Sequence, residues 1–234
     1  MAEPEACLVD VYDTLLSCDF VGHRAELPLL AGLSMQAWGE GYRQIGRAFG
    51  VGQLTKAEGF ERILRDAGVE ARPDLVRALV NKDREVLLRS ARLYEDALPF
   101  LRDVRARGIK IAIVSNCSEH TRELLESNGV AELADSLVLS CEVGAEKPAA
   151  EIFGRALEQL GVPAGRALFV DDQPSYCAGA ADLGIVAVQI VRGEVASWVG
   201  KVPAPGTTVV RSLTEVAAML GGSAGADQGV EQVG

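Results

Sequence analysis

The chain has 234 residues, of which 48% are hydrophobic and 24% charged, values that are ordinary for a globular protein and argue against a disordered or a membrane protein. This length fits one α/β domain, or a core with a small accessory domain. The formal net charge of -10 disfavours nucleic acid as a partner, because binding a polyanion requires basic patches. A small anionic substrate remains compatible with this charge if local donors and a cation offset the negative field.

The first predicted element is a buried strand that ends near Asp10, because EACLVDVYDTLL opens with an apolar run and then turns polar. From about residue 34 to residue 90 the apolar residues follow a helical period, with Pro73 near a helix start. After residue 90, helix-like and strand-like segments alternate, which predicts a parallel sheet with right-handed crossovers. Left-handed helix caps are expected at four glycines: Gly108, Gly129, Gly161 and Gly184.

This order of elements predicts an α/β fold, a Rossmann-like parallel sheet with a small α-helical cap domain. The core is expected at residues 1–18 and 91–221, the helical cap at 19–90, and a flexible tail at the Gly-rich segment 222–234. The cap is expected over the edge where the strands end, which is where ligands bind in open α/β folds. The apolar share of the cap is compatible with homodimer contacts and equally with packing on the core.

The sequence predicts a cytoplasmic protein without membrane contact. No apolar run approaches the ~20 residues that a spanning helix needs, and MAEPEACLVD is acidic where a signal peptide is basic. The five cysteines are odd in number, are widely spaced and contain no C-x-x-C pair. We therefore expect free thiols at Cys7, Cys18, Cys117, Cys141 and Cys177.

Four short motifs each follow a predicted strand. They are LVDVYDTLL with Asp10, Tyr12 and Thr14, AIVSN with Ser115 and Asn116, EKPAAEIF with Lys147, and LFVDD with Asp171 and Asp172. A carboxylate such as Asp10 can attack phosphorus or carbon and form an aspartyl intermediate, which divides one difficult displacement into two easier ones. Ser115 can donate hydrogen bonds to a transferring oxyanion. Lys147 adds positive charge that offsets the repulsion among the carboxylates.

In this order the four motifs resemble those of the haloacid dehalogenase-like (HAD) superfamily, over about residues 6–190. The resemblance implies a hydrolase with Asp10 as the nucleophile and with Tyr12 and Lys147 as further catalytic residues. It implies substrate contacts from Thr14, Ser115 and Asn116. The leading interpretation is a phosphatase-type enzyme that acts on a small phosphorylated metabolite through an aspartyl-phosphate on Asp10.

A magnesium site is expected beside the nucleophile. Carboxylate oxygens are the hard ligands that Mg²⁺ prefers, with waters completing an octahedron. The expected ligands are Asp10, the backbone carbonyl of Tyr12, Asp171 and Asp172, and the resemblance makes Asp172 stronger than Asp171. In such a site the cation neutralises phosphate charge during transfer.

Tyr12 departs from the pattern of the superfamily's phosphatases, in which the residue two positions after the nucleophile is usually an acid. A phenol with an unperturbed pKa of ~10 is a poor general base at neutral pH, although it can donate a hydrogen bond. Asp10 followed by Tyr12 resembles instead the 2-haloacid dehalogenases, which displace halide from carbon without a metal. The acidic pair Asp171 and Asp172 argues against that interpretation.

Two alternatives to the phosphatase therefore stay open: a metal-free dehalogenase-like hydrolase, and a degenerate member that binds a small anion or a partner without turnover. Asp13 could replace the missing acid if its loop turned inward, whereas a turn residue at the usual glycine position is its ordinary interpretation. Arg43 of the predicted cap could bind a substrate carboxylate, as an arginine does in the dehalogenases, although most cap arginines face solvent. The substrate itself is not identified by these motifs.

Overall fold

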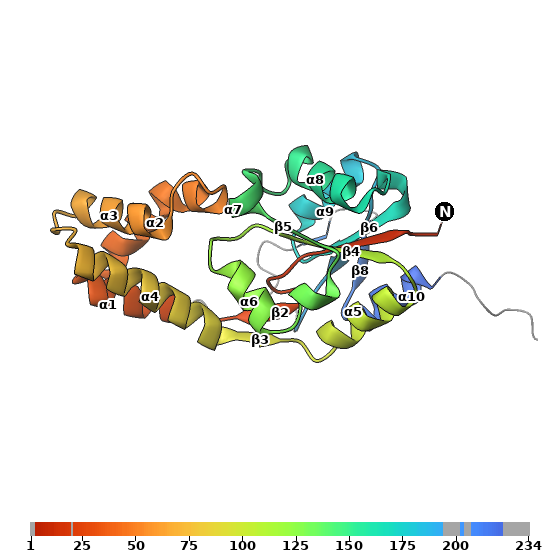
Figure 1. Cartoon of the computed structure of the whole chain (residues 1–234), viewed down its shortest axis with the longest axis horizontal. Coiled ribbons are helices and arrows are strands. Elements are labelled where there is room, and N and C mark those ends of the chain that lie inside the picture. The colour runs from red at the N-terminus through yellow and green to blue at the C-terminus, as the bar shows by residue number, and fades with distance from the viewer. Residues whose placement is uncertain (1–2, 20, 194–201, 204–206, 222–234) are drawn as a thin grey trace, which may run out of the picture.

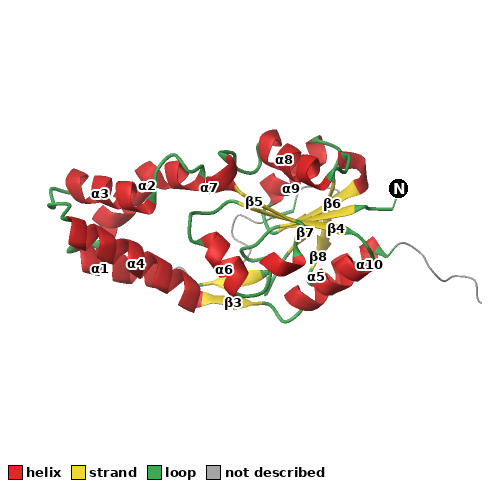
Figure 2. Cartoon of the chain, viewed as in Figure 1, coloured by secondary structure: helices red, strands yellow, loops and turns green. Residues whose placement is uncertain are grey.

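The core of the fold is a parallel sheet with the strand order β5-β4-β1-β6-β7-β8 (Figures 1 and 2). The computed structural model describes residues 3–19, 21–193, 202–203 and 207–221, so the predicted tail at 222–234 lies outside the described residues. The strands are β1 (Ala6–Val9), β4 (Lys110–Ser115), β5 (Ser136–Leu139), β6 (Ala167–Asp171), β7 (Val186–Ile190) and β8 (Thr208–Val210). This order confirms the predicted Rossmann-like sheet.

Helices cover both faces of the sheet (Figure 1). One face is covered by α5 (Ala97–Ala106), α6 (Thr121–Ser127) and α10 (Leu213–Leu220), and the other by α8 (Ala150–Leu160) and α9 (Pro174–Asp182). A short helix, α7 (Ser140–Val143), follows β5 directly. Among the described helices, none combines the length and apolar character that crossing a bilayer requires.

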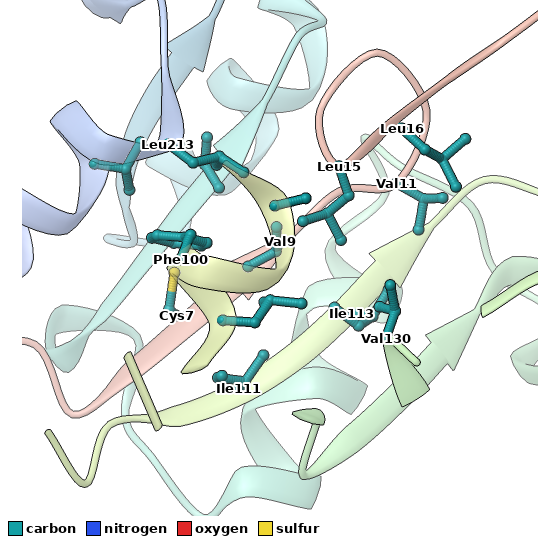
Figure 3. Close-up of a cluster of buried hydrophobic side chains, with 14 of the residues drawn as sticks. Cys7, Val9, Val11, Leu15, Leu16, Phe100, Ile111, Ile113, Val130 and Leu213 are labelled. Carbon is teal, nitrogen blue, oxygen red and sulfur yellow. The ribbon is translucent and has the colours of Figure 1, made fainter. Parts of the chain in front are cut away.

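Successive side chains of a strand point to opposite faces of the sheet, and both faces are covered by helices. The strands therefore have continuous apolar sequences. Cys7 and Val9 of β1 face the α5 side, where Phe100 packs on them (Figure 3). Ala6 and Leu8 face the α8 side, and all four β1 side chains are fully buried. Because both faces are covered, the strands are held rigidly. The residues at their carboxyl ends are therefore held in fixed positions.

Four helices that come between β1 and β4 in the sequence form a second cluster. They are α1 (Val21–Ala31), α2 (Met35–Gly50), α3 (Lys56–Asp66) and α4 (Pro73–Ser90), and we refer to them as the cap helices. They share a hydrophobic core of their own that includes Trp38 and Phe60. A Cβ atom at Gly59 would lie 2.1 Å from the Phe49 ring, so glycine is what allows α2 and α3 to approach this closely. The division of the chain into two domains stays a prediction.

A two-stranded antiparallel sheet joins the cap helices to the core, and the sequence patterns did not predict it. β2 (Leu16–Cys18) pairs with β3 (Ala91–Leu93), with Leu16 opposite Leu93. Strands of three residues are too short to show a period. The predicted glycine caps are confirmed, since Gly108, Gly129, Gly161 and Gly184 all have positive φ, and Gly161 caps α8 in the left-handed conformation.

Candidate active site

Strand register brings Asp10 beside the acidic pair. β1 lies next to β6, with Val9 opposite Val170, so the next residues, Asp10 and Asp171, follow at the same edge of the sheet. The N–H of Asp10 donates to the carbonyl of Val170 at 3.0 Å and fixes its backbone. One carboxylate oxygen each from Asp10, Asp171 and Asp172 lies within 4.8 Å of the others, and all three residues are buried. Negative charge is therefore concentrated at this point.

Lys147 is the cation that offsets this charge. Its Nζ lies 2.6 Å from Asp10 Oδ1 and 2.6 Å from Asp171 Oδ2, and its side chain is fully buried. Burial alone lowers the pKa of Lys147, but the carboxylates of Asp10 and Asp171 outweigh it and raise that pKa above its ordinary value. Burial, and then the charge of Asp10, raise the pKa of Asp171 well above its ordinary value. A further positive charge would relieve this repulsion.

Asn116 holds the backbone of Lys147 in place. Its Nδ2 donates to the Lys147 carbonyl at 2.9 Å, and its Oδ1 accepts from the Lys147 N–H at 2.7 Å. The same Nδ2 donates to the Tyr176 hydroxyl at 3.2 Å, and the Tyr176 ring lies 5.1 Å from Lys147 Nζ. Because its amide is engaged with the lysine segment, the structure gives Asn116 a positioning function. Its predicted contact with substrate stays a prediction.

Two predicted substrate contacts are buried hydroxyls. Ser115 ends β4, Thr14 follows β1, and both residues are fully buried. Among the described residues, neither hydroxyl has a hydrogen-bond partner. A buried polar group without a hydrogen-bond partner lowers the stability of the fold by about 1–3 kcal/mol, so such a group often has a functional reason. A bound oxyanion would supply an acceptor.

Tyr12 contacts the core through its hydroxyl, and its predicted catalytic role stays a prediction. Its hydroxyl lies 3.0 Å from Thr121 Oγ1, and burial raises the pKa of Tyr12 further above its ordinary value. The phenol therefore ionises less readily than the side chain of a free tyrosine. Asp13 follows with a φ of +56°, the left-handed conformation of a tight turn, in agreement with its interpretation as a turn residue.

A hollow of about 720 Å³ separates the cap helices from the strand ends, and its lining includes Tyr12, Asn116 and Cys117 of the core. From the cap helices it is lined by Arg24, Leu27, Met35, Trp38, Tyr42, Arg43, Lys56, Asp83 and Leu87. The Arg43 side chain is 70% exposed and pairs with Glu40 on its own helix. Its predicted contact with a substrate carboxylate stays a prediction.

One pair beside the catalytic loop was missed by the sequence reasoning. Arg192 donates to the Thr14 carbonyl from Nη2 at 2.7 Å and from Nε at 3.2 Å. The same guanidinium donates to both oxygens of Asp96, at 2.8 and 2.9 Å, and Asp96 also accepts the N–H of Leu213 at 2.8 Å. Arg192 thereby ties the loop after β1 to the start of α5. The sequence offers no signal for this pair beyond an arginine that follows an apolar strand.

Replacing Asp96 with asparagine should produce a pH-dependent loss of stability. Burial raises the pKa of Asp96, but hydrogen bonds from Arg192 and Leu213 outweigh it, so the folded pKa lies below the unfolded one. The ionised form therefore stabilises the fold above the unfolded pKa, and this contribution disappears as the pH falls through the folded pKa. We expect a loss of about 2 kcal/mol at neutral pH, shrinking in acid.

Urea unfolding across the acidic range measures this difference. The matched control is Glu95→Gln, which changes an exposed neighbouring carboxyl and should leave the free energy of unfolding within about 0.5 kcal/mol of the parent. A constant difference between Asp96→Asn and the parent at every pH would contradict the ionic origin of the contribution.

Lys147→Met should destabilise the fold strongly in the absence of divalent cations. The substitution leaves Asp10 and Asp171 buried without their shared partner, and breaking a buried pair in this way costs about 3–5 kcal/mol. The free energy of unfolding in urea with a chelator measures the loss. Lys82→Met, which removes a partly exposed lysine paired with Glu85, should cost under about 1 kcal/mol. Equal losses in the two variants would contradict the account.

A Rossmann-like parallel sheet that gathers carboxylates and a lysine at its strand ends, beneath a cluster of helices, is the arrangement of an α/β enzyme with a carboxylate-centred site. The family model of the haloacid dehalogenase-like hydrolases matches residues 4–184. The chain belongs to this family of hydrolases, as the four motifs indicated.

Curated and solved relatives agree with this assignment. A glyceraldehyde 3-phosphate phosphatase of Methanopyrus kandleri is 30% identical over 198 residues, which cover 81% of this chain and 85% of that protein. A HAD phosphatase of Thermococcus onnurineus has a TM-score of 0.63 at 23% identity, covering 93% of this chain and 98% of the other. An L-2-haloacid dehalogenase of Xanthobacter autotrophicus has a TM-score of 0.65 at 18% identity, covering 94% and 100%. Phosphatases and a dehalogenase thus share this fold, and the sequence relative is a phosphatase.

Proposed function

We propose that this chain is a Mg²⁺-dependent phosphatase that hydrolyses a small phosphorylated metabolite through an aspartyl-phosphate on Asp10. The observation that carries the proposal is the convergence of three buried carboxylates within 4.8 Å, with Lys147 bonded to two of them. The relative from Methanopyrus kandleri, which is a phosphatase by name, supports phosphoryl chemistry. The match to the family supports hydrolysis.

The chemistry begins at the Asp10 carboxylate. Lys147 donates to Oδ1, which leaves Oδ2 to attack phosphorus while the bond from phosphorus to the leaving oxygen breaks. The leaving oxygen takes a proton from solvent, because Tyr12 stands at the position where a carboxylic acid would otherwise supply it. Ser115 offers its hydroxyl to a phosphoryl oxygen, which gives this buried group a partner. Water then attacks phosphorus, releases inorganic phosphate and restores the Asp10 carboxylate.

The donor set fits magnesium. Three carboxylates face the single charge of Lys147, so the cluster keeps an excess of negative charge that a divalent cation offsets. Asp10, Asp171, Asp172 and the Tyr12 carbonyl would hold the ion, the set inferred from the motifs. Bound there, Mg²⁺ supplies positive charge against the phosphoryl oxygens.

The pocket supports a small substrate. A volume of about 720 Å³ lies within the range of about 300–1,000 Å³ that small-molecule sites span, and its walls combine aromatic rings with Arg24 and Arg43. We therefore propose a compact anionic metabolite as the partner in the site. Cytoplasmic location stays a prediction, as does a homodimer, for which the exposed Val21 and Leu29 on α1 offer apolar area.

A dehalogenase-like hydrolase is the second candidate, and Tyr12 is the observation that favours it. A neutral phenol two positions after the nucleophile suits displacement at carbon, where no leaving alcohol needs a proton. Against it, a metal-free reaction has no use for a third buried carboxylate beside Asp10 and Asp171.

Trapping with beryllium fluoride tests the proposal. In the presence of Mg²⁺, beryllium fluoride should bind the Asp10 carboxylate as a phosphate mimic and raise the unfolding temperature, and Asp10→Asn should lose this shift. Release of halide from 2-chloropropionate without a metal would establish the second candidate instead. If the chain hydrolyses no phosphate ester, releases no halide and forms no beryllium fluoride adduct, it binds its ligand without turnover.

A further inference from the structure

Two cysteines lie side by side where the strand ends meet the cap helices. β4 and β5 are parallel, with Ser115 opposite Leu139. Cys117 and Cys141, each two residues further along, therefore lie at the same edge of the sheet. The Sγ atoms of Cys117 and Cys141 are 3.9 Å apart. An S–S bond is about 2.05 Å long, so closing one here requires an approach of roughly 2 Å.

The Ser140 hydroxyl holds the two cysteine segments together. The N–H of Cys117 donates to Ser140 Oγ at 2.9 Å, and the Ser140 hydroxyl lies 3.3 Å from the Cys117 carbonyl, to which it donates. Ser140 directly precedes Cys141 and is fully buried. The proximity of the two residues therefore rests on strand register and on the buried Ser140 hydroxyl, which contacts both backbone groups of Cys117.

A small oxidant can reach Cys117 through the hollow beside the cap helices. Cys117 is 9% exposed and lines the hollow of about 720 Å³, and Cys141 is half-buried. The hydrogen bond between the two thiols lowers the pKa of Cys117 and raises that of Cys141. Cys117 is consequently the sulfur of the pair that loses its proton more readily.

The other three cysteines lack these properties. Cys7 is fully buried, and burial raises its pKa to about 12. Cys177 is buried in α9, where burial also raises its pKa. Cys18 is half-buried and lies against the Ser90 hydroxyl at 3.2 Å, with its pKa raised by burial. Cys117 and Cys141 are therefore the one sulfur–sulfur contact among these five described residues.

Both cysteines are adjacent to contacts on which the site depends. Cys117 follows Asn116, whose amide holds both backbone groups of Lys147. The carbonyl of Cys141 packs against Gly52 of the cap segment so closely that a Cβ at Gly52 would lie 2.0 Å from it. A movement of Cys117 would therefore disturb the hydrogen bonds between Asn116 and Lys147. A movement of Cys141 would disturb the contact with Gly52 of the cap segment.

We propose that Cys117 and Cys141 form a reversible disulfide in response to a hydroperoxide and that this bond lowers turnover at the adjacent site, a regulation that rests on the proposed function. The Cys117 thiolate attacks the peroxide, the O–O bond breaks, and a sulfenic acid and an alkoxide form, the latter taking a proton from water. The Cys141 sulfur then attacks the sulfenic sulfur, the S–O bond breaks, and the departing hydroxide takes the Cys141 proton to give water. The two thiols lose two electrons and the peroxide gains them; a dithiol reverses the change by exchange.

The test treats the full chain with hydrogen peroxide and then with dithiothreitol. Digestion without reductant should yield the peptide pair joined through Cys117 and Cys141, with two hydrogen atoms lost. Hydrolysis of p-nitrophenyl phosphate should fall roughly 10- to 100-fold, because displacements of about 1 Å cost this much in catalysis. Dithiothreitol should restore both the mass and the rate.

Three variants separate the steps, each compared with its own untreated rate. Cys141→Ser should be inactivated by peroxide without recovery in dithiothreitol, because its sulfenic acid has no resolving thiol and oxidises further. Cys117→Ser should lose the peroxide response. Cys18→Ser is the matched control, a half-buried cysteine without a sulfur partner, and should respond like the parent.

Separate outcomes overturn separate parts of the inference. Cys117 and Cys141 that remain unjoined after peroxide, in a chain that is still folded, overturn the redox pair. A complete bond with an unchanged rate overturns the regulation. A chain that forms the bond but never hydrolyses phosphate esters overturns the proposed function and keeps the redox pair, because the mass readout is independent of turnover.

Discussion

Asp10→Asn should lower the hydrolysis of phosphate esters by at least about 10⁴-fold, as expected when the nucleophile of a covalent mechanism is removed. The amide that replaces the carboxylate is nearly isosteric but carries no charge to attack phosphorus. The Lys147 ammonium keeps Asp171 as its ion-pair partner, so the fold should survive. The rate with p-nitrophenyl phosphate and Mg²⁺, together with circular dichroism of the variant, measures both effects.

The matched control for this loss is Asp182→Asn, which neutralises an exposed carboxylate at the end of α9. That variant should retain the parent's rate within about twofold, since surface substitutions rarely change stability by more than about 0.5 kcal/mol. If Asp10→Asn kept a tenth of the parent's activity in a folded chain, an aspartyl-phosphate on this residue would no longer be tenable.

The sheet was predictable because its strands are buried on both faces. Segments such as IAIV and LFV read as apolar runs, and a glycine after each helix marks where the chain turns back, as at Gly161. These are local signals that survive without knowledge of the rest of the fold. The three-residue strands β2 and β3 carry no such signal, because each is stabilised by its pairing with the other.

The grouping of the carboxylates at one edge of the sheet was predictable for a different reason. Parallel strands deliver their carboxyl ends to one edge, so Asp10 and Asp171 had to lie near each other once the sheet existed. The motifs also indicated that Lys147 would offset the carboxylate charges. Its contacts with Asp10 Oδ1 and Asp171 Oδ2 depend on the path of its loop, which sequence spacing does not specify. The Arg192–Asp96 pair lies beyond sequence reasoning for the same reason, since it joins residues 96 positions apart.

Tyr12→Asp should raise the hydrolysis of alkyl phosphates by about 10²-fold, within the range that general acid–base catalysis contributes. The parent presents a phenol whose pKa burial holds above its ordinary value, so no nearby group protonates an alkoxide leaving group efficiently. A carboxyl at this position could give its proton to the leaving oxygen and then take one from the attacking water. Rates with glycerol phosphate, compared with those for p-nitrophenyl phosphate, measure this effect, because a nitrophenolate leaves without a proton.

Two controls decide what such a gain means. Tyr12→Phe removes only the hydroxyl that contacts Thr121 and should show no gain on either ester. Asp13→Gly tests whether Asp13 already acts as the acid: its left-handed backbone is favourable for glycine, so the fold should be kept, and the alkyl phosphate rate should fall only if the carboxyl serves in catalysis. A gain in Tyr12→Asp that is equal for both esters would point to a wider pocket and away from proton transfer. A gain confined to the alkyl ester would identify residue 12 as the position that limits this chain as a phosphatase.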